Sequence, residues 1–194
     1  MNVAQAYSAV AELYIGLFGA ADKVDPDDLA LIRRHLAGRA GPVLDLGCGP
    51  GHITRFLRSL GADARGVDVV PEFIAHARAA DPDGDYRLES IDELELAEHS
   101  VGGILSWYSL IHRPPREVDG VLAAFHRALA PGGALVIGFF VGEGPFEHKV
   151  TTAYRYTPDE MSRRLADVGF TEVERLVRLE DPVHRPHAAI AATR

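Results

Sequence analysis

Short apolar runs alternate with longer amphipathic stretches along most of the 194 residues. An apolar run of about four to eight residues suits a strand buried in a sheet, whereas apolar residues three and four apart suit a helix that covers it. The alternation therefore predicts an α/β fold with helices on both faces of a mostly parallel sheet. The predicted strands open the segment 42–51 and occupy 64–68, 85–88, 101–110, 134–140, 171–178 and 187–193, and the predicted helices are 3–18, 27–37, 52–61, 71–80, 114–130 and 158–168.

A glycine-rich turn, LDLGCGPG, joins the first predicted strand to the helix after it. Gly47, Gly49 and Gly51 stand between the two elements, where glycine lets the backbone turn sharply and approach a ligand closely. Such a string also suits a plain strand-to-helix turn without a ligand. Asp68 ends the next strand, where a carboxylate can accept hydrogen bonds from both hydroxyls of a ribose. Together the two features indicate a nucleoside-binding site.

The glycine spacing separates two kinds of nucleoside ligand. A dinucleotide site needs a third glycine three positions after the second; His52 stands there and the glycine comes at Gly51, which disfavours NAD, FAD and a nicotinamide-dependent oxidoreductase. Asp45, just before the turn, would repel a pyrophosphate and attract an α-amino group. The pattern favours an amino acid joined to adenosine.

Three motifs in order resemble those of the class I S-adenosylmethionine-dependent methyltransferases. VLDLGCGPG (43–51) is similar to the first motif of that family, GVDVVPEFIAHAR (66–78) to its strand-two acid and following helix, and FHRALAPGGALVI (125–137) to its late PGG motif. AYSAVAELY (6–14) resembles the tyrosine-bearing N-terminal helix that covers the bound cofactor. The resemblance implies S-adenosyl-L-methionine as the cofactor and S-adenosyl-L-homocysteine as its product. It also implies a doubly wound, Rossmann-like seven-stranded sheet in the order 3-2-1-4-5-7-6, with strand seven antiparallel.

The resemblance implies a cofactor site along the first four strands, with two departures from the family's pattern. Where an acid often stands beside the adenine after strand three, this chain has Ser90 and then Ile91, so we expect Ile91 and backbone groups to hold the adenine. The aspartate that usually opens strand four is replaced by Gly102, which concerns local turn geometry. We expect Cys48 to be a small residue that fills the turn. The expected cofactor-binding residues are Tyr7, Asp45, Gly47, Cys48, Gly49, Gly51, His52, Asp68, Val69, Ser90, Ile91, Ser106 and Trp107.

Ligands of such a sheet bind at the carboxyl ends of the parallel strands, where this sequence predicts an aromatic acceptor pocket with several histidines. The segment 141–156 is long for a loop and is therefore a candidate functional segment. For a hydroxyl acceptor, His112 is the first candidate general base and His148 the second; a structural hydrogen-bonding role is the alternative for each. Trp107 and Tyr108 either form the floor of the site or pack in the core of the sheet. The expected pocket residues are Tyr14, Tyr108, Phe140, Phe146, Tyr154, His184 and His187.

Composition and charge limit the kinds of molecule that the protein is expected to bind. Lys and Arg number 20 against 28 Asp and Glu, and the net charge of −8 argues against a nucleic acid or an anionic membrane surface. Cys48 is the one cysteine, no His/Cys/Asp spacing recommends a metal site, and we expect no metal. The N-terminus lacks a basic leader region, and no apolar run reaches the roughly 18 residues of a membrane span. We expect a cytoplasmic protein, either a monomer or a homodimer.

The size fits one domain, 1–194, with an N-terminal helical cap (1–41) and a Rossmann-like core (42–194). The predicted function is in-line transfer of a methyl group to a small, partly apolar molecule, with O-methylation as the first guess. The short segment before the first strand disfavours a large partner, and SWYS at the end of strand four, in place of an NPPY-like tetrapeptide, disfavours nucleic-acid bases and glutamine. The alternative is a catalytically silent S-adenosylmethionine-binding or scaffold protein of the same fold.

Overall fold

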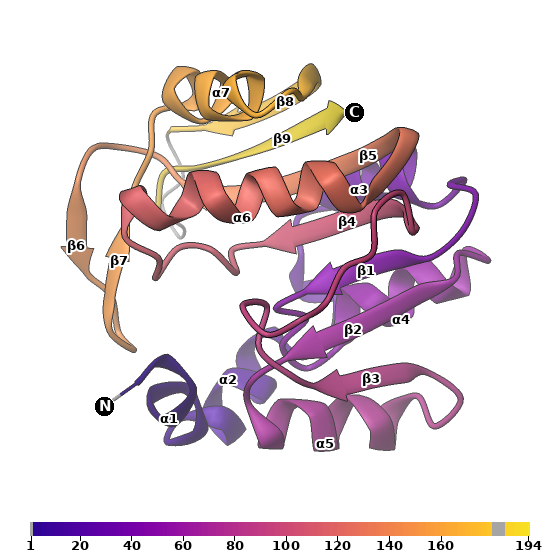
Figure 1. The fold of residues 1–194 in the computed structure, drawn as a ribbon. Coiled ribbons are helices and arrows are strands. Elements are labelled where there is room, and N and C mark those ends of the chain that lie inside the picture. Colours follow the sequence, from indigo (N-terminus) through magenta and orange to yellow (C-terminus); the bar gives the residue numbers. More distant parts are fainter. Residues whose placement is uncertain (1, 180–184) are drawn as a thin grey trace.

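A computed structural model describes residues 2–179 and 185–194 of the chain, and within them a seven-stranded sheet is the central feature (Figure 1). The strand order is β3-β2-β1-β4-β5-β9-β8. Neighbours from β3 to β5 are parallel, while β9 pairs antiparallel with both β5 and β8. The predicted Rossmann-like order with an antiparallel last strand is therefore confirmed. The strands are β1 Val43–Leu46, β2 Ala64–Asp68, β3 Asp85–Leu88, β4 Val101–Trp107, β5 Leu129–Phe140, β8 Thr171–Arg178 and β9 His187–Thr193.

Helices cover both faces of the sheet because its central strands are apolar on both sides. Six of the seven residues of β4 and six of the seven of β9 are buried, whereas the edge strand β8 alternates exposed and half-buried residues. In Figure 1, α6 and α7 lie in front of the sheet, and α3 and α4 lie behind it. The helices are α1 Val3–Ser8, α2 Ala11–Phe18, α3 Pro26–Leu36, α4 His52–Ser59, α5 Pro71–Ala80, α6 Pro115–Ala128 and α7 Pro158–Asp167, with a short 3₁₀ turn at Ala21–Lys23.

The N-terminal segment is divided more finely than the sequence pattern predicts. The single helix expected over 3–18 is wrong: α1 and α2 are separate, because Val10 has non-helical dihedral angles. The break brings Tyr7 and Tyr14 together on Phe73, at ring-centroid distances of 6.0 and 5.1 Å. Helix α3 instead packs its buried residues on the sheet face with β1, β4, β5 and β9. Within 1–41, therefore, α1 and α2 lie at the carboxyl ends of β1 and β2, and α3 belongs to a layer of the core (Figure 1).

Two other local predictions are corrected. The segment 141–156 is not a plain loop, because β6 Pro145–Glu147 and β7 Thr152–Tyr154 form an antiparallel hairpin within it. Residues 131–133, which lie between the predicted helix 114–130 and the predicted strand 134–140 and are expected from the sequence to form a turn, belong to β5, where Gly132 has φ +75° and the pairing with β4 skips between Val101 and Gly103. In both places local turn residues suggested a break, and strand pairing overrode them. The hairpin lies beyond the carboxyl ends of the strands, on the same side of the sheet as α1 (Figure 1).

Candidate active site

The three glycines of the turn after β1 all have left-handed backbone angles, but for different reasons. Their φ values are +82° at Gly47, +53° at Gly49 and +76° at Gly51. A Cβ atom on Gly47 would lie 2.3 Å from the Cβ of Ser109, and one on Gly51 would lie 2.7 Å from the Cβ of Ala77. A Cβ on Gly49 would meet nothing closer than Tyr14 Cε1 at 4.0 Å. Packing therefore requires glycine at the outer two positions, whereas Gly49 leaves its backbone open to a ligand.

Asp68, at the end of β2, is locked against this turn by two backbone donors. Its Oδ2 accepts a hydrogen bond from the Gly49 amide at 2.8 Å, and its Oδ1 accepts one from the Val70 amide at 2.9 Å. A carboxylate offers about four lone-pair sites, so both oxygens can accept further hydrogen bonds. Burial raises the pKa of Asp68 above its usual value. The geometry fits the two hydroxyls of a ribose.

Asp45 lies buried beneath the turn, with an exposed fraction of 1%. Its Oδ2 accepts a hydrogen bond from the Thr54 hydroxyl at 2.6 Å, and burial raises the pKa of its carboxyl to about 7. Cys48 packs with Ile74, Ala77 and Tyr86, and burial raises the pKa of its thiol well above the usual value. Asp45 can thus attract a cation at the turn, while Cys48 fills space.

The residue that opens α4 adds an unpaired polar atom beside the turn. Burial lowers the pKa of His52 to about 4, and its buried Nδ1 has no hydrogen-bond partner. Since a buried polar nitrogen without a partner is costly, a bound ligand that donates to Nδ1 would be stabilised there.

Two tyrosines of the N-terminal helices lie over the carboxyl ends of β1 and β2. The Tyr7 and Tyr14 rings meet edge to face at 5.6 Å and pack with Val69, Val70 and Phe73. Sequence reasoning assigned Tyr14 to the acceptor pocket, but the structure places it beside Gly49, at the predicted cofactor site. The Tyr7 ring also contacts His112, at a centroid distance of 5.6 Å.

His112 follows β4, and both of its ring nitrogens have partners. Nδ1 lies 2.8 Å from the carbonyl oxygen of Thr152, and Nε2 lies 3.0 Å from the hydroxyl of Tyr7. A carbonyl can only accept, so Nδ1 carries the proton and Nε2 accepts from Tyr7 in the neutral ring. Burial lowers the pKa of His112, which keeps the ring neutral at pH 7. The arrangement leaves a basic nitrogen at the sheet edge.

His148 stands beside His112, with its ring centroid 5.4 Å away. Its pKa is lowered to about 4, first by burial and then by electrostatic interaction with His112, Arg185 and Lys149. Its Nδ1 accepts a long hydrogen bond, 3.5 Å, from the Val150 amide. His148 is therefore a weaker base than His112 in this environment.

An aromatic wall continues from the two histidines across the ends of β4, β5 and the hairpin. Phe140 lies between Tyr108 and Phe146, at centroid distances of 5.2 and 5.5 Å, and His148 lies 5.9 Å from Phe140. Tyr108 has φ +56°, a rare angle for a bulky residue, and it packs on His187 at 6.3 Å. The structure thus brings together most of the predicted acceptor-pocket residues.

Several predicted residues make contacts within the protein. Ser106 is fully buried and shares a hydrogen bond with Ser109, and Trp107 packs on the core layer that includes α3. Tyr154 is half-buried against the core on the α6 side and donates its amide to the Ile111 carbonyl. His184 lies outside the described residues. The Ser90 hydroxyl accepts from the Asp92 amide and so caps the start of its own loop.

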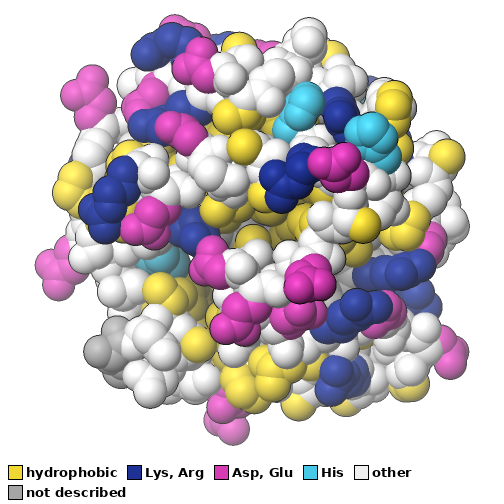
Figure 2. Space-filling view, in the orientation of Figure 1, with side chains coloured by type: hydrophobic (Ala, Val, Ile, Leu, Met, Phe, Trp, Pro, Cys, Tyr) yellow, Lys and Arg dark blue, Asp and Glu magenta, His cyan; other side chains and the backbone are white. Residues whose placement is uncertain are grey.

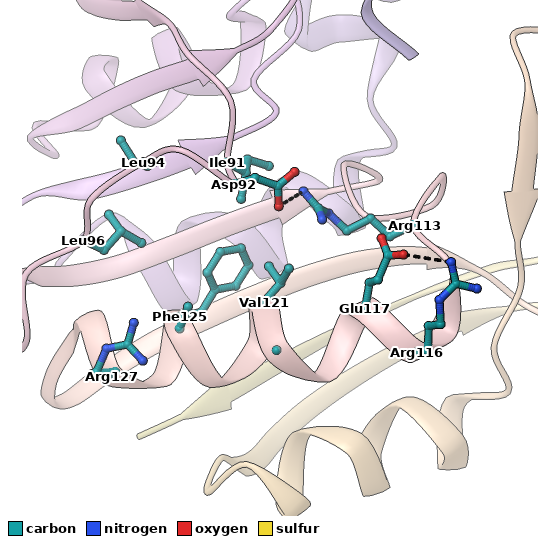
Figure 3. Close-up of a pocket in the computed structure, with 12 residues that line it drawn as sticks. Ile91, Asp92, Leu94, Leu96, Arg113, Arg116, Glu117, Val121, Phe125 and Arg127 are labelled. Atoms are coloured by element: carbon teal, nitrogen blue, oxygen red, sulfur yellow. Dashed lines mark hydrogen bonds and ion pairs between the residues drawn. The ribbon is translucent and has the colours of Figure 1, made fainter. Parts of the chain in front are cut away.

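A groove of about 550 Å³ runs between α6 and the loop after β3. Figure 2 shows hydrophobic side chains in this hollow with charged side chains around it. Ion pairs link Arg113 to Asp92 and Arg116 to Glu117 along one side (Figure 3). Of the predicted cofactor residues, Ile91 lines the groove, and none of the three glycines of the turn does.

Sequence reasoning missed two contributors to this region and assigned no role to a third, Arg185. The Thr152 carbonyl is a backbone group without a side-chain signal, and its contact with His112 depends on the hairpin. Arg155 and Arg185 place their guanidinium groups over the ring of Phe146. The sequence predicts that residues 181–187 bring Arg185 to the rim of the acceptor pocket, because an antiparallel last strand begins at that edge of the sheet, whereas Arg155 gives no signal in the sequence. Among the described residues, no group of three metal-ligating side chains forms, and no helix is long and apolar enough to cross a membrane.

Comparison with known proteins points to one family. The family model described as "Methyltransferase domain" matches residues 43–133, from β1 into β5. The chain is similar to malonyl-[acyl-carrier protein] O-methyltransferase of Pseudescherichia vulneris, with 31% identity over 50% of this chain and 38% of that protein. It is also similar to ubiquinone biosynthesis O-methyltransferase of Xanthomonas oryzae pv. oryzae, with 29% identity over 57% of this chain and 46% of the relative. The matched part thus spans less than half the length of these two curated relatives.

A solved structure extends the likeness over the whole chain at the level of the fold. It is Burkholderia thailandensis 1,6-didemethyltoxoflavin-N1-methyltransferase with bound 1,6-didemethyltoxoflavin and S-adenosylhomocysteine. The TM-score is 0.73 at 23% identity, and the alignment covers 100% of this chain and 91% of that one. Fold, motifs and site geometry therefore agree.

Proposed function

Because the chain belongs to the class I S-adenosylmethionine-dependent methyltransferases, a family of enzymes, we propose that it transfers a methyl group from S-adenosyl-L-methionine to a hydroxyl of a small, partly apolar molecule. One observation carries the choice of a hydroxyl: His112 offers Nε2 as a base while the Thr152 carbonyl holds Nδ1–H. The aromatic wall beside it suits a small ring-bearing or apolar acceptor. The names of two relatives, both O-methyltransferases, agree with the choice of oxygen.

The residues of the turn fit the cofactor. Asp68 would accept from the ribose hydroxyls, Asp45 would attract the α-ammonium group, and the open backbone at Gly49 admits close approach. When bound, S-adenosyl-L-methionine supplies an electrophilic methyl group on its sulfonium. Tyr7 and Tyr14 would cover this site and exclude water.

In the proposed reaction His112 is the general base. Nε2 accepts the proton of the acceptor hydroxyl, and the resulting imidazolium keeps its Nδ1–H bond to the Thr152 carbonyl. The Tyr7 hydroxyl, which donates to Nε2 in this structure, must give way to the acceptor. The aromatic wall of Tyr108, Phe140 and Phe146 orients the acceptor for in-line attack.

Calorimetric titration with S-adenosyl-L-methionine and S-adenosyl-L-homocysteine tests the cofactor site. We expect saturable binding to the intact protein and a loss of about 10- to 100-fold in Asp68→Ala, since a charge-assisted hydrogen bond contributes about 1.5–3 kcal/mol. Asp85→Ala is the matched control, because Asp85 stands on the neighbouring strand and pairs only with exposed Arg87. If the intact protein binds neither compound, the proposal is wrong and the silent-scaffold alternative replaces it.

A further inference from the structure

Two arginines flank the phenylalanine that ends the aromatic wall. The guanidinium carbon of Arg155 lies 5.2 Å from the centroid of Phe146, and that of Arg185 lies 5.0 Å from it. Phe146 in turn lies 6.0 Å from His148, which neighbours His112. Two positive charges therefore stand two ring contacts away from the proposed base, through Phe146 and His148.

These two guanidinium groups have no carboxylate partner among the residues that the structure describes, whereas nine other arginines do. The Nε of Arg155 is buried and has no hydrogen-bond partner. A buried charged donor without an acceptor costs more than about 1–3 kcal/mol, so the folded protein is stabilised by any ligand that supplies an acceptor there. Arg155 thus combines a half-buried side chain with a charged donor that lacks an acceptor.

The nearby carboxylates of the hairpin face solvent. Phe146 and His148 are half-buried, whereas Glu147 between them is exposed, as the alternation of side chains along a strand requires. Glu143 is exposed as well, and Lys149 adds a further positive charge. The pKa of His148 is lowered first by burial, and the charges of Arg185 and Lys149 lower it further, in a chain whose net charge is −8.

We propose that the methyl acceptor carries an anionic group, a carboxylate or a phosphate, which Arg155 and Arg185 bind while the hydroxyl of the acceptor faces His112. This inference rests on the proposed function and narrows its substrate class. Planar guanidinium groups match both kinds of anion through paired N–H donors, and their contact with the Phe146 ring holds both groups at the end of the aromatic wall.

The test uses small aromatic anions as probes on protein saturated with S-adenosyl-L-homocysteine. Benzoate and phenyl phosphate are titrated by calorimetry against benzamide, which has nearly the shape of benzoate without its charge. The variants are R155Q, R185Q and the double substitution, and R163Q is the matched control because Arg163 is exposed on α7. We expect the intact protein and R163Q to bind at least one anion about tenfold or more tightly than benzamide, and the double variant to lose the preference.

Two results overturn the inference. One is equal affinity for benzamide and both anions, or a preference that persists in the double variant. The other is no binding of either anion at about 10 mM, ten times the upper end of ordinary Michaelis constants. Prior titration with S-adenosyl-L-homocysteine distinguishes failure of the proposed function from failure of this inference. If that compound does not bind, the proposed function is wrong. If it binds but the protein shows no preference for an anion, only this inference is wrong. R185Q keeps the test valid if R155Q unfolds, since Arg185 is exposed.

Discussion

Gly49→Ala separates the cofactor-binding role of the glycine turn from its role in folding. A Cβ at this position would have ordinary van der Waals contact with Tyr14 Cε1 at 4.0 Å and no closer neighbour, so the folded protein has room for it. The remaining cost is the left-handed angle of +53°, about 1–2 kcal/mol for a residue with a side chain. We therefore expect the free energy of unfolding to fall by about that amount.

Binding should suffer much more than stability. The added methyl group would stand where the backbone is expected to meet the cofactor, and overpacking of one methyl group costs about 1–3 kcal/mol. The affinity for S-adenosyl-L-homocysteine should therefore fall by about 10- to 100-fold, because each 1.4 kcal/mol is about a factor of ten. Urea unfolding of the free protein and calorimetric titration measure the two quantities separately.

Gly61→Ala is the matched control. Gly61 follows α4 with φ +87°, and a Cβ there would meet nothing within 4 Å, so its substitution imposes the same kind of strain away from the site. We expect both variants to lose similar stability, and only Gly49→Ala to lose affinity. Binding by Gly49→Ala within about twofold of the intact protein would refute the assignment of Gly49 to the cofactor site.

Three further predictions concern buried titratable or charged groups: Asp45, His112 and the Arg178–Asp28 pair. Below about pH 7 the Asp45 carboxyl becomes protonated and no longer attracts a cation, so affinity for S-adenosyl-L-methionine should fall on acidification; in Asp45→Asn, calorimetry should show a flat pH dependence. NMR titration should give His112 a pKa below 6.5 with the Nδ1–H tautomer, and Tyr7→Phe should leave that tautomer unchanged; the Nε2–H tautomer would remove His112 as the base. Arg178→Met should lower the free energy of unfolding by about 3–5 kcal/mol because it leaves the buried Asp28 without its partner, and adding Asp28→Asn should recover part of the loss; unchanged urea unfolding would contradict this account.

Gly102 shows how one departure from the family's pattern acquires a physical reason. In the sequence it is only a glycine where an aspartate is usual. In the structure, a Cβ at Gly102 would lie 2.0 Å from the Ala40 carbonyl oxygen, so the segment before β1 passes directly over the start of β4. The reason for glycine at position 102 became clear only from the structure, because the segment that excludes a side chain there lies about 60 positions earlier in the sequence.

The sequence alone determined most strands and helices, the glycine turn and its acid, because these depend on local signals: apolar runs, glycines at fixed spacing and a carboxylate at a strand end. The strand order was predicted from the resemblance of three motifs to a known family, and the structure confirms it. The tertiary structure decided which side chains meet across the carboxyl edge. Tyr7 reaches His112 over 105 positions, and the Thr152 carbonyl fixes the His112 tautomer from a hairpin that local patterns leave unmarked. It also placed Tyr14 beside the glycine turn and packed the half-buried Trp107 against the core layer that includes α3. Such contacts depend on long-range packing and on backbone acceptors, and neither has a residue pattern to reveal it.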